Sequence, residues 1–415
     1  MPGSLADDAR SKCWGIGLQT ERKVWALQAS NIEGPATPVR GREREQLDLE
    51  ARREEFRLKL ERIRQWLSQE RLDGVLLTRR DSFAWATAGG DNRVSSATEM
   101  GAADLWVDHD SVVLLANNIE APRIDEEELD GLDVEVFAWP WYRDAEAEIQ
   151  RFVAGRHGAS DAPKAGLGPR PQALFELRCQ LTPQEIERYL ELGRLAAEAV
   201  ETVAARLSRK ESERQIAARL NAALLERGLE PVVTLVAADG RMHRYRHPIP
   251  TDNVVERSAM LVSCARKGGL IASLTRLVHF GRLSKDLEER HAAVVQIDAA
   301  IMQRTRPGKS GADLFDDLTR LYAEAGFPGE WELHHQGGAT GYASREWRAS
   351  PNETRKVQLH QAFAWNPSIT GTKSEDTIVV TEEGFTLLTQ GSGKWPVLSV
   401  EVDGNVIQRP DILRL

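Results

Sequence analysis

Histidine is the residue type in this sequence that is best suited to proton transfer near neutral pH. His247 lies in RYRHPIPTDNVV, and His334 and His335 are adjacent in HHQGG. A neutral imidazole near physiological pH can take a proton from water and return it to a leaving nitrogen, which hydrolysis of an amide-like or amidine-like bond requires. EWELHHQGG has the pattern of a strand, where successive side chains point to opposite faces. We therefore expect that His334 and His335 do not share one site, and that His334 is a hydrogen-bonded histidine behind it or in the opposite core.

A charged pair in ASREW offers a second kind of chemistry. The guanidinium of Arg345 presents a planar fork that suits a carboxylate, and the carboxylate of Glu346 suits an ammonium or guanidinium group. Together they predict contacts to a small zwitterion. The alternative is that the two residues form structural salt bridges with each other or with other strands.

The chain is long enough to position such residues on two hydrophobic cores, because it has 415 residues of which 41% are hydrophobic and 28% charged. Its net charge is -9, and its lysines and arginines are scattered among acidic residues. No basic patch that would bind a phosphate backbone is visible, so we expect no nucleic-acid partner.

The three cysteines, Cys13, Cys179 and Cys264, are odd in number and widely spaced. They favour neither a disulfide framework nor a CxxC metal site, which is typical of a reducing cytoplasm. No run approaches the roughly 18 apolar residues of a membrane span, and MPGSLADDAR lacks the apolar core of a signal peptide. We expect a cytoplasmic protein that is neither exported nor embedded in a membrane.

The first part of the chain predicts an extension followed by an α/β domain. Residues 1–45 mix glycine, proline and charge without a period and predict a partly disordered extension. From Asp48 apolar residues recur at helical spacing, and DGVLLT then predicts a buried strand. The glycine- and proline-containing segment 155–172 predicts a linker, so this domain covers 46–165.

The second part, residues 170–415, begins with a helix. Thr182 is its expected N-cap, Pro183 its first residue and Glu185 the partner in a capping box. A second helix ends at Gly228, strands follow, two further helices cover roughly 285–303 and 307–327, and the remainder predicts strands.

Six stretches of this second part occur in the order that they have in the creatinase, prolidase and aminopeptidase P family, which the chain resembles. They are TPQEIERY, ESERQIAARL, RHPIPTDNVVERSAMLVSC, GGLIASLTRLVHFG, HHQGGATGY and KSEDTIVVTEEG. Residues 48–140 also resemble the smaller N-terminal domain of that family. The resemblance implies an α+β protein with a C-terminal pita-bread fold, a smaller α/β creatinase-like domain before it, and a homodimer.

Metallopeptidases of this family hold two divalent cations with two aspartates, one histidine and two glutamates. By the match, the aspartate positions fall at Ser263 and Ser273, the histidine at His335, and the glutamates at Asn366 and Glu375. Four carboxylates would offset the charge of two divalent cations, whereas only Glu375 remains. Serine hydroxyls and an amide are poor substitutes for carboxylates on hard cations. We therefore expect no bound metal and no cofactor.

Creatinase, a member of this family, hydrolyses a C–N bond of creatine without metal and relies on a histidine that matches His247. The resemblance implies catalytic roles for His247, His335 and Glu375, with the substrate contacted by Arg345, Glu346, Asn366, Ser263 and Ser273. It also implies that the first domain of a partner chain closes over the site, with Phe83 and Trp85 of DSFAWATAGG reaching across. The alternative for these two aromatic residues is that they are core residues of their own domain.

The sequence therefore predicts a metal-independent hydrolase of a C–N bond in a small amino-acid-like or guanidino-like substrate. One alternative is a catalytically silent relative of the peptidases that binds a peptide or protein. Another is a residual metal-dependent Xaa-Pro peptidase, with one ion held by His335, Glu375 and either Glu346 or His334.

Overall fold

The computed structural model describes the backbone of residues 39–415 and the side chains from residue 49 onward. Most of the predicted extension, residues 1–38, lies outside this part of the chain. Helix α1 spans Val39–Glu70 and so begins earlier than the expected start at Asp48. Its apolar stripe of Phe56, Leu60, Ile63 and Leu67 is buried, as the helical spacing predicted.

Helix α1 is followed by a mixed six-stranded sheet with the order β4-β3-β2-β1-β5-β6. Its strands are β1 (Gly74–Arg79), β2 (Met100–Asp108), β3 (Val112–Asn117), β4 (Glu135–Trp139), β5 (Gly158–Ser160) and β6 (Gly168–Pro169). The connecting helices are α2 (Arg80–Ala86), α3 (Ala121–Arg123), a π-helical turn (Ile124–Glu128), α4 (Ala145–Val153) and α5 (Pro171–Arg178). β1 is the predicted buried strand, and five of its six residues are buried.

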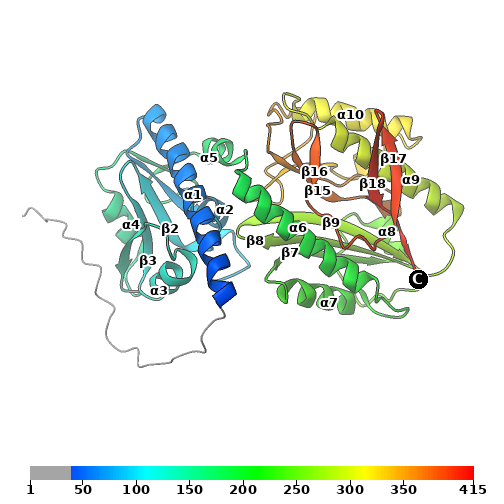
Figure 1. The fold of residues 1–415 in the computed structure, drawn as a ribbon, viewed down its shortest axis with the longest axis horizontal. Helices are drawn as coiled ribbons and strands as arrows, with labels where there is room; N and C mark the ends of the chain where they lie inside the picture. Colours follow the sequence, from blue (N-terminus) through cyan, green and yellow to red (C-terminus); the bar gives the residue numbers. More distant parts are fainter. Residues whose placement is uncertain (1–38) are drawn as a thin grey trace, which may run out of the picture. The chain divides into compact units, whose positions relative to one another are not determined.

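A second sheet has the order β19-β9-β8-β7, and helices α6 and α7 pack against it (Figure 1). These elements are α6 (Pro183–Ala204), α7 (Glu213–Leu225), β7 (Glu230–Ala238), β8 (Ser258–Lys267), β9 (Leu270–His279) and β19 (Leu413–Arg414). The predicted capping box at Thr182 is confirmed, since its side chain accepts from the backbone of Glu185 and the glutamate returns a bond. Among the described residues, the longest antiparallel pairing in this sheet joins β8 to β9.

A third sheet has the order β11-β10-β12-β15-β16, and contacts between β15 and β9 connect it to the second. Its strands are β10 (Gly337–Thr340), β11 (Trp347–Arg348), β12 (Ala362–Trp365), β15 (Asp376–Val380) and β16 (Phe385–Leu387). Two hairpins accompany it, β13 (Ser368–Ile369) with β14 (Thr372–Lys373), and β17 (Val397–Val402) with β18 (Asn405–Pro410). The remaining helices are α8 (Gly240–Arg244), α9 (Lys285–Arg304), α10 (Gly311–Glu324) and a 3-10 helix (Glu330–Leu333).

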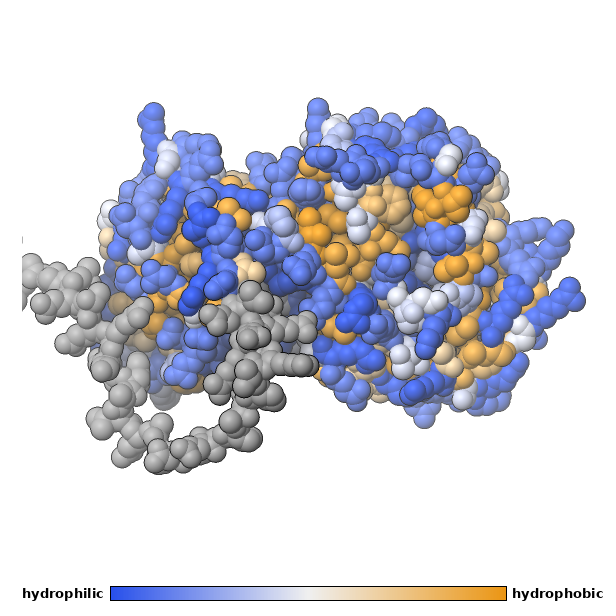
Figure 2. All heavy atoms as spheres, in the orientation of Figure 1, coloured by the Kyte–Doolittle hydropathy of each residue, from blue (hydrophilic) through white to orange (hydrophobic). Residues whose placement is uncertain are grey.

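The predicted α+β class is confirmed by these three sheets and their helices. The first sheet ends at Pro169 and the second begins at Glu230, while one hydrophobic cluster includes residues of both. The division into 46–165 and 170–415 stays a prediction. Within residues 39–415, no helix is long and apolar enough to cross a membrane. On the face drawn in Figure 2, hydrophilic residues cover most of the view and apolar areas lie between them.

Candidate active site

The three histidines named above gather in one cluster. His247 lies in the loop after α8, His334 follows the 3-10 helix, and His335 precedes β10. The Nε2 atoms of His247 and His334 are 3.2 Å apart, and the rings of His334 and His335 are stacked with centroids 4.4 Å apart. The centroid of the His247 ring lies 5.6 Å from that of His335. His247 is exposed and His334 is 9% exposed, so the cluster reaches solvent through His247.

The prediction that His334 and His335 cannot share a site is wrong. It assumed a strand through both residues, but residues 330–333 form a 3-10 helix and β10 begins only at Gly337. Gly337 has φ +116°, and a Cβ there would lie 2.3 Å from the carbonyl oxygen of Ala364. The glycine therefore permits both the unusual backbone and the close approach to β12 that follow the histidine pair.

Polar contacts hold the two segments of the cluster together. Arg246 donates to the carboxylate of Glu330 at 3.1 Å and to the hydroxyl of Thr370 at 3.0 Å. Gln336 donates to the carbonyl oxygen of Trp331 at 3.0 Å. Arg246 thus ties the residue before His247 to segments far away in the sequence, whereas Gln336 fixes the backbone before the histidine pair.

All three imidazoles are neutral at pH 7. Burial lowers the pKa of His247 and His334, and the ammonium of Lys373 lowers both further. Burial also lowers the pKa of His335, to about 3, with the guanidinium of Arg345 as the next cause. Neutral imidazoles carry a lone pair that can accept a proton or bind a metal ion.

Glu375, directly before β15, is 2% exposed and is bound by cations of the protein. The ammonium of Lys373 lies 2.6 Å from its Oε2, and the hydroxyl of Thr275 donates to the same oxygen at 2.6 Å. The guanidinium of Arg345 lies 3.6 Å from Oε1. Burial acts to raise the pKa of Glu375, but the charges of Lys373 and Arg345 outweigh it and the pKa is lowered. Glu375 is therefore ionised and neutralised from within the chain.

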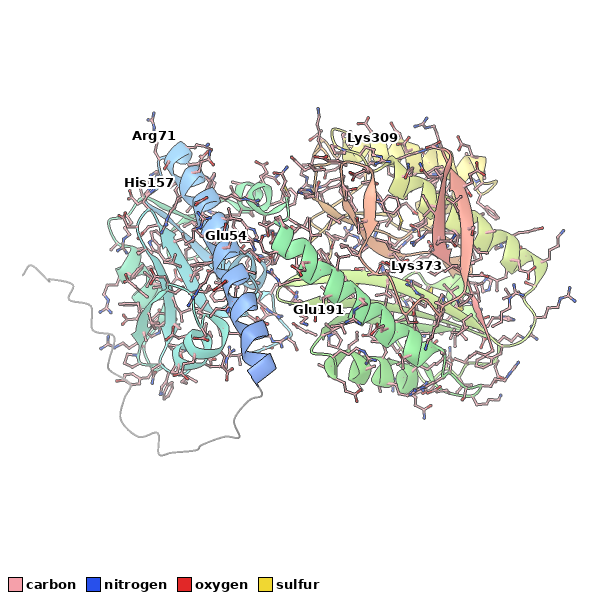
Figure 3. All side chains as sticks on the ribbon, in the orientation of Figure 1. Glu54, Arg71, His157, Glu191, Lys309 and Lys373 are labelled. Atoms are coloured by element: carbon pink, nitrogen blue, oxygen red, sulfur yellow. The ribbon has the colours of Figure 1, made fainter. Side chains whose placement is uncertain are left out.

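Lys373 was missed in the sequence analysis. It is 4% exposed and lies on β14, two residues before Glu375 (Figure 3). The signal was present in the stretch GTKSEDT, since residues two apart in an extended segment share a face. Lys373 has this spacing from Glu375, the only carboxylate that remains of the ligand set, so the spacing predicts that the two side chains can form an ion pair.

The prediction that Ser263 contributes to the site is wrong. In the register of β8 and β9, Cys264 lies opposite Ser273 and Val262 lies opposite Thr275. Opposed residues share a face, so the face that carries Ser273 and Thr275 excludes Ser263. Ser273 does lie on this face, and its hydroxyl donates to the sulfur of Cys264 at 3.2 Å.

Asn366 follows β12 and is 3% exposed. Its backbone N–H donates to Gln336 at 3.0 Å, but its Oδ1 has no hydrogen-bond partner among the described residues. A buried acceptor without a partner is costly, so this oxygen is available to a donor of a bound molecule.

Arg345 and Glu346 diverge. Glu346 forms an ion pair with Arg178 of α5 at 2.8 Å, and Arg178 also contacts Asp81 at 3.2 Å. The predicted joint binding of a zwitterion is therefore wrong for Glu346, which forms a structural salt bridge, although with helix α5 and not with Arg345 or another strand. Arg345 faces Glu375, and its Nε is buried without a partner in the described part of the chain.

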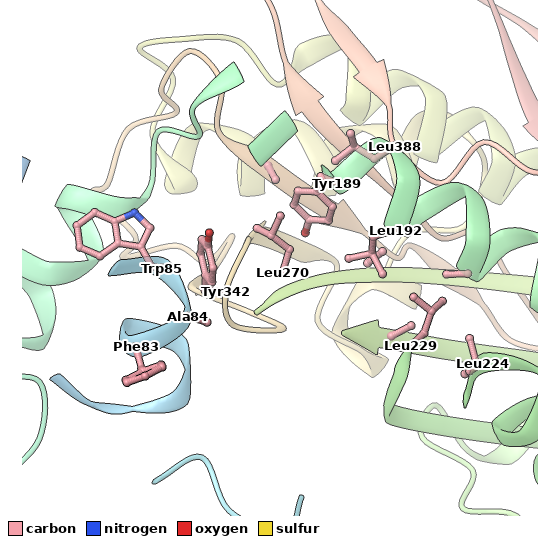
Figure 4. Packing of buried hydrophobic residues seen from close by; sticks show 14 of the residues in the cluster. Phe83, Ala84, Trp85, Tyr189, Leu192, Leu224, Leu229, Leu270, Tyr342 and Leu388 are labelled. Atoms are coloured by element: carbon pink, nitrogen blue, oxygen red, sulfur yellow. The ribbon is translucent and has the colours of Figure 1, made fainter. Parts of the chain in front are cut away.

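Phe83 and Trp85 are both fully buried in their own chain (Figure 4). Trp85 lies in the same hydrophobic cluster as Tyr342, and Lys59 lies over both rings. These contacts correct the expectation that the two aromatic residues reach across to a partner chain, because neither presents a surface. They are core residues, as the alternative stated.

Comparisons with known proteins agree with this fold. Residues 187–382 match the model of metallopeptidase family M24. The Xaa-Pro dipeptidase of Pyrococcus furiosus is 24% identical over 226 residues, which are 52% of this chain and 64% of that relative. The aligned part therefore spans less than two thirds of the relative's length.

Solved structures cover more of the chain. The prolidase from Pyrococcus horikoshii has a TM-score of 0.68 at 19% identity and covers 80% of this chain and 98% of its own. The N-terminal domain of the FACT complex subunit SPT16 from chickpea has a TM-score of 0.63 at 10% identity, covering 81% and 96%. At these identities the likeness shows the fold.

The sheets, helices and matched segments define an α+β protein with a C-terminal pita-bread fold and a smaller N-terminal α/β domain. Residues 187–382 match metallopeptidase family M24, and the chain is similar in sequence and fold to the prolidases.

The residues present do not fit the dinuclear metal centre of that family. A hydroxyl at Ser273 and an amide at Asn366 replace carboxylates, and the site face of β8 presents Val262 and Cys264. The remaining carboxylate, Glu375, is already bound by the ammonium of Lys373. Two hard divalent cations would have to displace this ion pair without gaining further anionic ligands.

Proposed function

We propose that this protein is a hydrolase that cleaves a C–N bond in a small, carboxylate-bearing substrate without a dinuclear metal centre. The observation that carries the proposal is the ion pair between Lys373 and Glu375 at 2.6 Å, with both side chains at most 4% exposed. A permanent cation of the chain thus lies on the carboxylate that would otherwise bind metal. The match to a family of peptidases supports hydrolysis as the reaction class.

His247 is the proposed general base and general acid. It is neutral at pH 7, because burial and Lys373 lower its pKa, and it is the member of the cluster exposed to solvent. It takes a proton from water as the oxygen attacks the carbon of the scissile bond. The imidazolium then returns this proton to the nitrogen as the C–N bond breaks.

His334 and His335 have supporting roles in this proposal. His334 lies within hydrogen-bond distance of His247, which fixes the orientation of the catalytic ring. His335 has a buried Nδ1 without a partner among the described residues, and this atom is available to a polar group of the substrate. Glu375 holds the ammonium of Lys373 in place and, already neutralised, is not a site for a cationic nitrogen.

The charges around the cluster favour an anionic substrate group. Lys373 and Arg345 supply two positive charges against the single negative charge of Glu375. Glu346, the other acidic candidate, is occupied by Arg178. Arg345, with its unpaired Nε, is the proposed partner of a substrate carboxylate, which narrows the predicted amino-acid-like or guanidino-like class to members that carry that group.

A second candidate function is binding without catalysis. The altered ligand set favours it, and the structure of a FACT complex subunit has the same fold at 10% identity. A metal-dependent Xaa-Pro peptidase is a third candidate, supported by the name of the Pyrococcus furiosus relative. A homodimer and a cytoplasmic location also remain proposals, and the free thiols of Cys179 and Cys264 are compatible with the latter.

A screen for ligands and turnover distinguishes these functions. N-acyl, amidino and guanidino carboxylic acids are tested by thermal shift, and any ligand is then assayed for hydrolysis with the wild type, His247→Gln and His243→Gln. His243 is an exposed histidine outside the cluster and is the matched control. We expect His247→Gln to lose roughly 10²–10⁴-fold in kcat while its affinity stays within a few-fold. Ligands without any turnover would instead support the binding protein.

A further inference from the structure

The geometry of the histidine cluster points to a second property. We propose that His247, His334 and His335 form a binding site for a single divalent cation of borderline softness, such as Zn²⁺, and that its occupation inhibits the enzyme. One ligand atom of each side chain can be chosen so that all three lie within 4.8 Å of one another. Among the described residues, these three form the one group of three or more histidine, cysteine or acidic side chains that is so placed.

The distances are close to those of a metal centre. A Zn–N bond of about 2.0–2.1 Å places two nitrogens of a tetrahedral site about 3.4 Å apart. The Nε2 atoms of His247 and His334 are 3.2 Å apart, so this pair already has the required separation. His335 has only to approach the pair by a small movement of its ring, and its stacking on His334 keeps it adjacent.

Unpartnered ring nitrogens support binding rather than mere proximity. The Nδ1 atoms of His334 and His335 are buried and have no hydrogen-bond partner within the described residues, so turning either ring toward an ion breaks no hydrogen bond at Nδ1.

The ligand type selects the ion. Three neutral imidazole nitrogens suit Zn²⁺, Co²⁺, Ni²⁺ or Cu²⁺, whereas Mg²⁺, Ca²⁺ and Mn²⁺ favour carboxylate oxygens. The carboxylate of Glu375 is held by Lys373 and does not add an anionic ligand. The excess positive charge of Lys373 and Arg345 weakens affinity, so the site is a regulatory one that fills when the free metal concentration rises.

Inhibition follows from the residue that the ion would occupy. A metal ion on Nε2 of His247 uses the single lone pair of the neutral ring and leaves Nδ1 protonated, so the ring can no longer accept a proton from water. This second half of the proposal rests on the proposed function, in which His247 acts as a free imidazole. The expected effect of the ion is therefore inhibition, which is the opposite of the activation expected from metal ions bound by carboxylates.

The test measures binding and activity separately. Co²⁺ is added to chelator-treated wild type, His334→Gln, His335→Gln and the control His243→Gln, and binding is followed by calorimetry and by the visible absorption of tetrahedral Co²⁺. We expect one ion per chain in the wild type and the control. Affinity should fall roughly 10-fold or more in either of the other variants, since even loss of a group that only supports a metal ligand typically costs 10–100-fold. Two cluster variants are used so that one that fails to fold leaves the other as the test.

Turnover of the best substrate is then measured with and without Zn²⁺. We expect inhibition in the wild type and in the control His243→Gln that a chelator reverses, with half-inhibition at the Zn²⁺ concentration that displaces half of the Co²⁺ from the site. Absence of Co²⁺ binding by the wild type would overturn the site. Binding with activation would overturn both the inhibition and the metal-independent reaction, whereas binding in a protein that never turns over would preserve the site and remove the proposed function.

Discussion

Replacing Lys373 with methionine removes the ammonium from the buried carboxylate of Glu375 while keeping a side chain of similar length. In the folded protein Lys373 is 4% exposed and Glu375 is 2% exposed, and their charged atoms are 2.6 Å apart. Removing one partner of such a pair leaves the other charge buried without compensation, which typically costs about 3–5 kcal/mol. The hydroxyl of Thr275 and the more distant guanidinium of Arg345 remain, so we expect a loss of about 3 kcal/mol, at the lower end of that range.

The matched control is Lys267→Met. Lys267 forms an ion pair with Glu191 at 2.9 Å, but the side chains are 40% and 53% exposed. Exposed pairs of this kind contribute about 0–1 kcal/mol. A chain of this length loses roughly 1.1 °C in Tm for each kcal/mol, so the expected loss in Tm is about 3 °C for Lys373→Met and about 1 °C or less for the control.

Differential scanning calorimetry of the two variants and the wild type measures this difference. The double variant Lys373→Met/Glu375→Gln removes both charges and should recover most of the lost stability, because an apolar and a neutral side chain no longer leave a buried ion. If Lys373→Met melts within a degree of Lys267→Met, then Lys373 does not neutralise Glu375, and the reasoning about the absent dinuclear centre fails.

Three further predictions concern individual side chains. The pKa of His335 is lowered by burial to about 3, so His335 contributes stability that is fully present above pH 6.5 and is lost as the pH falls from 6.5 towards 3. Urea unfolding at several pH values should therefore show that the free energy of unfolding depends less on pH over this range in His335→Gln than in the wild type. Arg345→Gln should weaken binding of a carboxylate ligand by roughly 10-fold or more in calorimetry, since hydrogen bonds to charged groups contribute about 1.5–3 kcal/mol, whereas the surface variant Arg194→Gln should leave affinity unchanged. Glu346→Gln should cost about 3 kcal/mol of stability, because it breaks the buried pair with Arg178, and should change ligand affinity by no more than a few-fold; a large loss of affinity without loss of stability would restore its role in substrate binding.

Local signals in the sequence predicted local structure well. The capping box at Thr182 and Glu185 depends on residues three apart, and it forms as expected. The buried stripe of α1 likewise follows from helical spacing alone. Both features are settled by neighbours within one helix, so the sequence carries enough information to predict them.

The errors in the candidate site have three different physical causes. His334 was placed on the wrong side because a 3-10 helix replaces the expected strand before Gly337. Ser263 was wrong because a shift of one residue in a strand reverses the face on which a side chain lies. Glu346 pairs with Arg178, a residue 168 positions away, and no local pattern predicts so distant a contact.

Lys373 differs from these errors because the sequence contained its signal. A lysine two residues before the remaining carboxylate shares its face in the extended segment that runs from β14 to β15. The prediction took account of the carboxylates that are missing from the ligand set but not of the additional cation, Lys373. The net charge of a candidate site depends on its lysines and arginines as well as on its carboxylates.

Turnover before and after removal of metal tests the central claim most directly. The protein is purified, treated exhaustively with chelator, checked by elemental analysis, and assayed with the best substrate from the screen, with and without added Mn²⁺. We predict that turnover survives chelation and that Mn²⁺ does not stimulate it, because Lys373 already occupies Glu375. Loss of turnover on chelation, restored by Mn²⁺ at two ions per chain, would contradict the account.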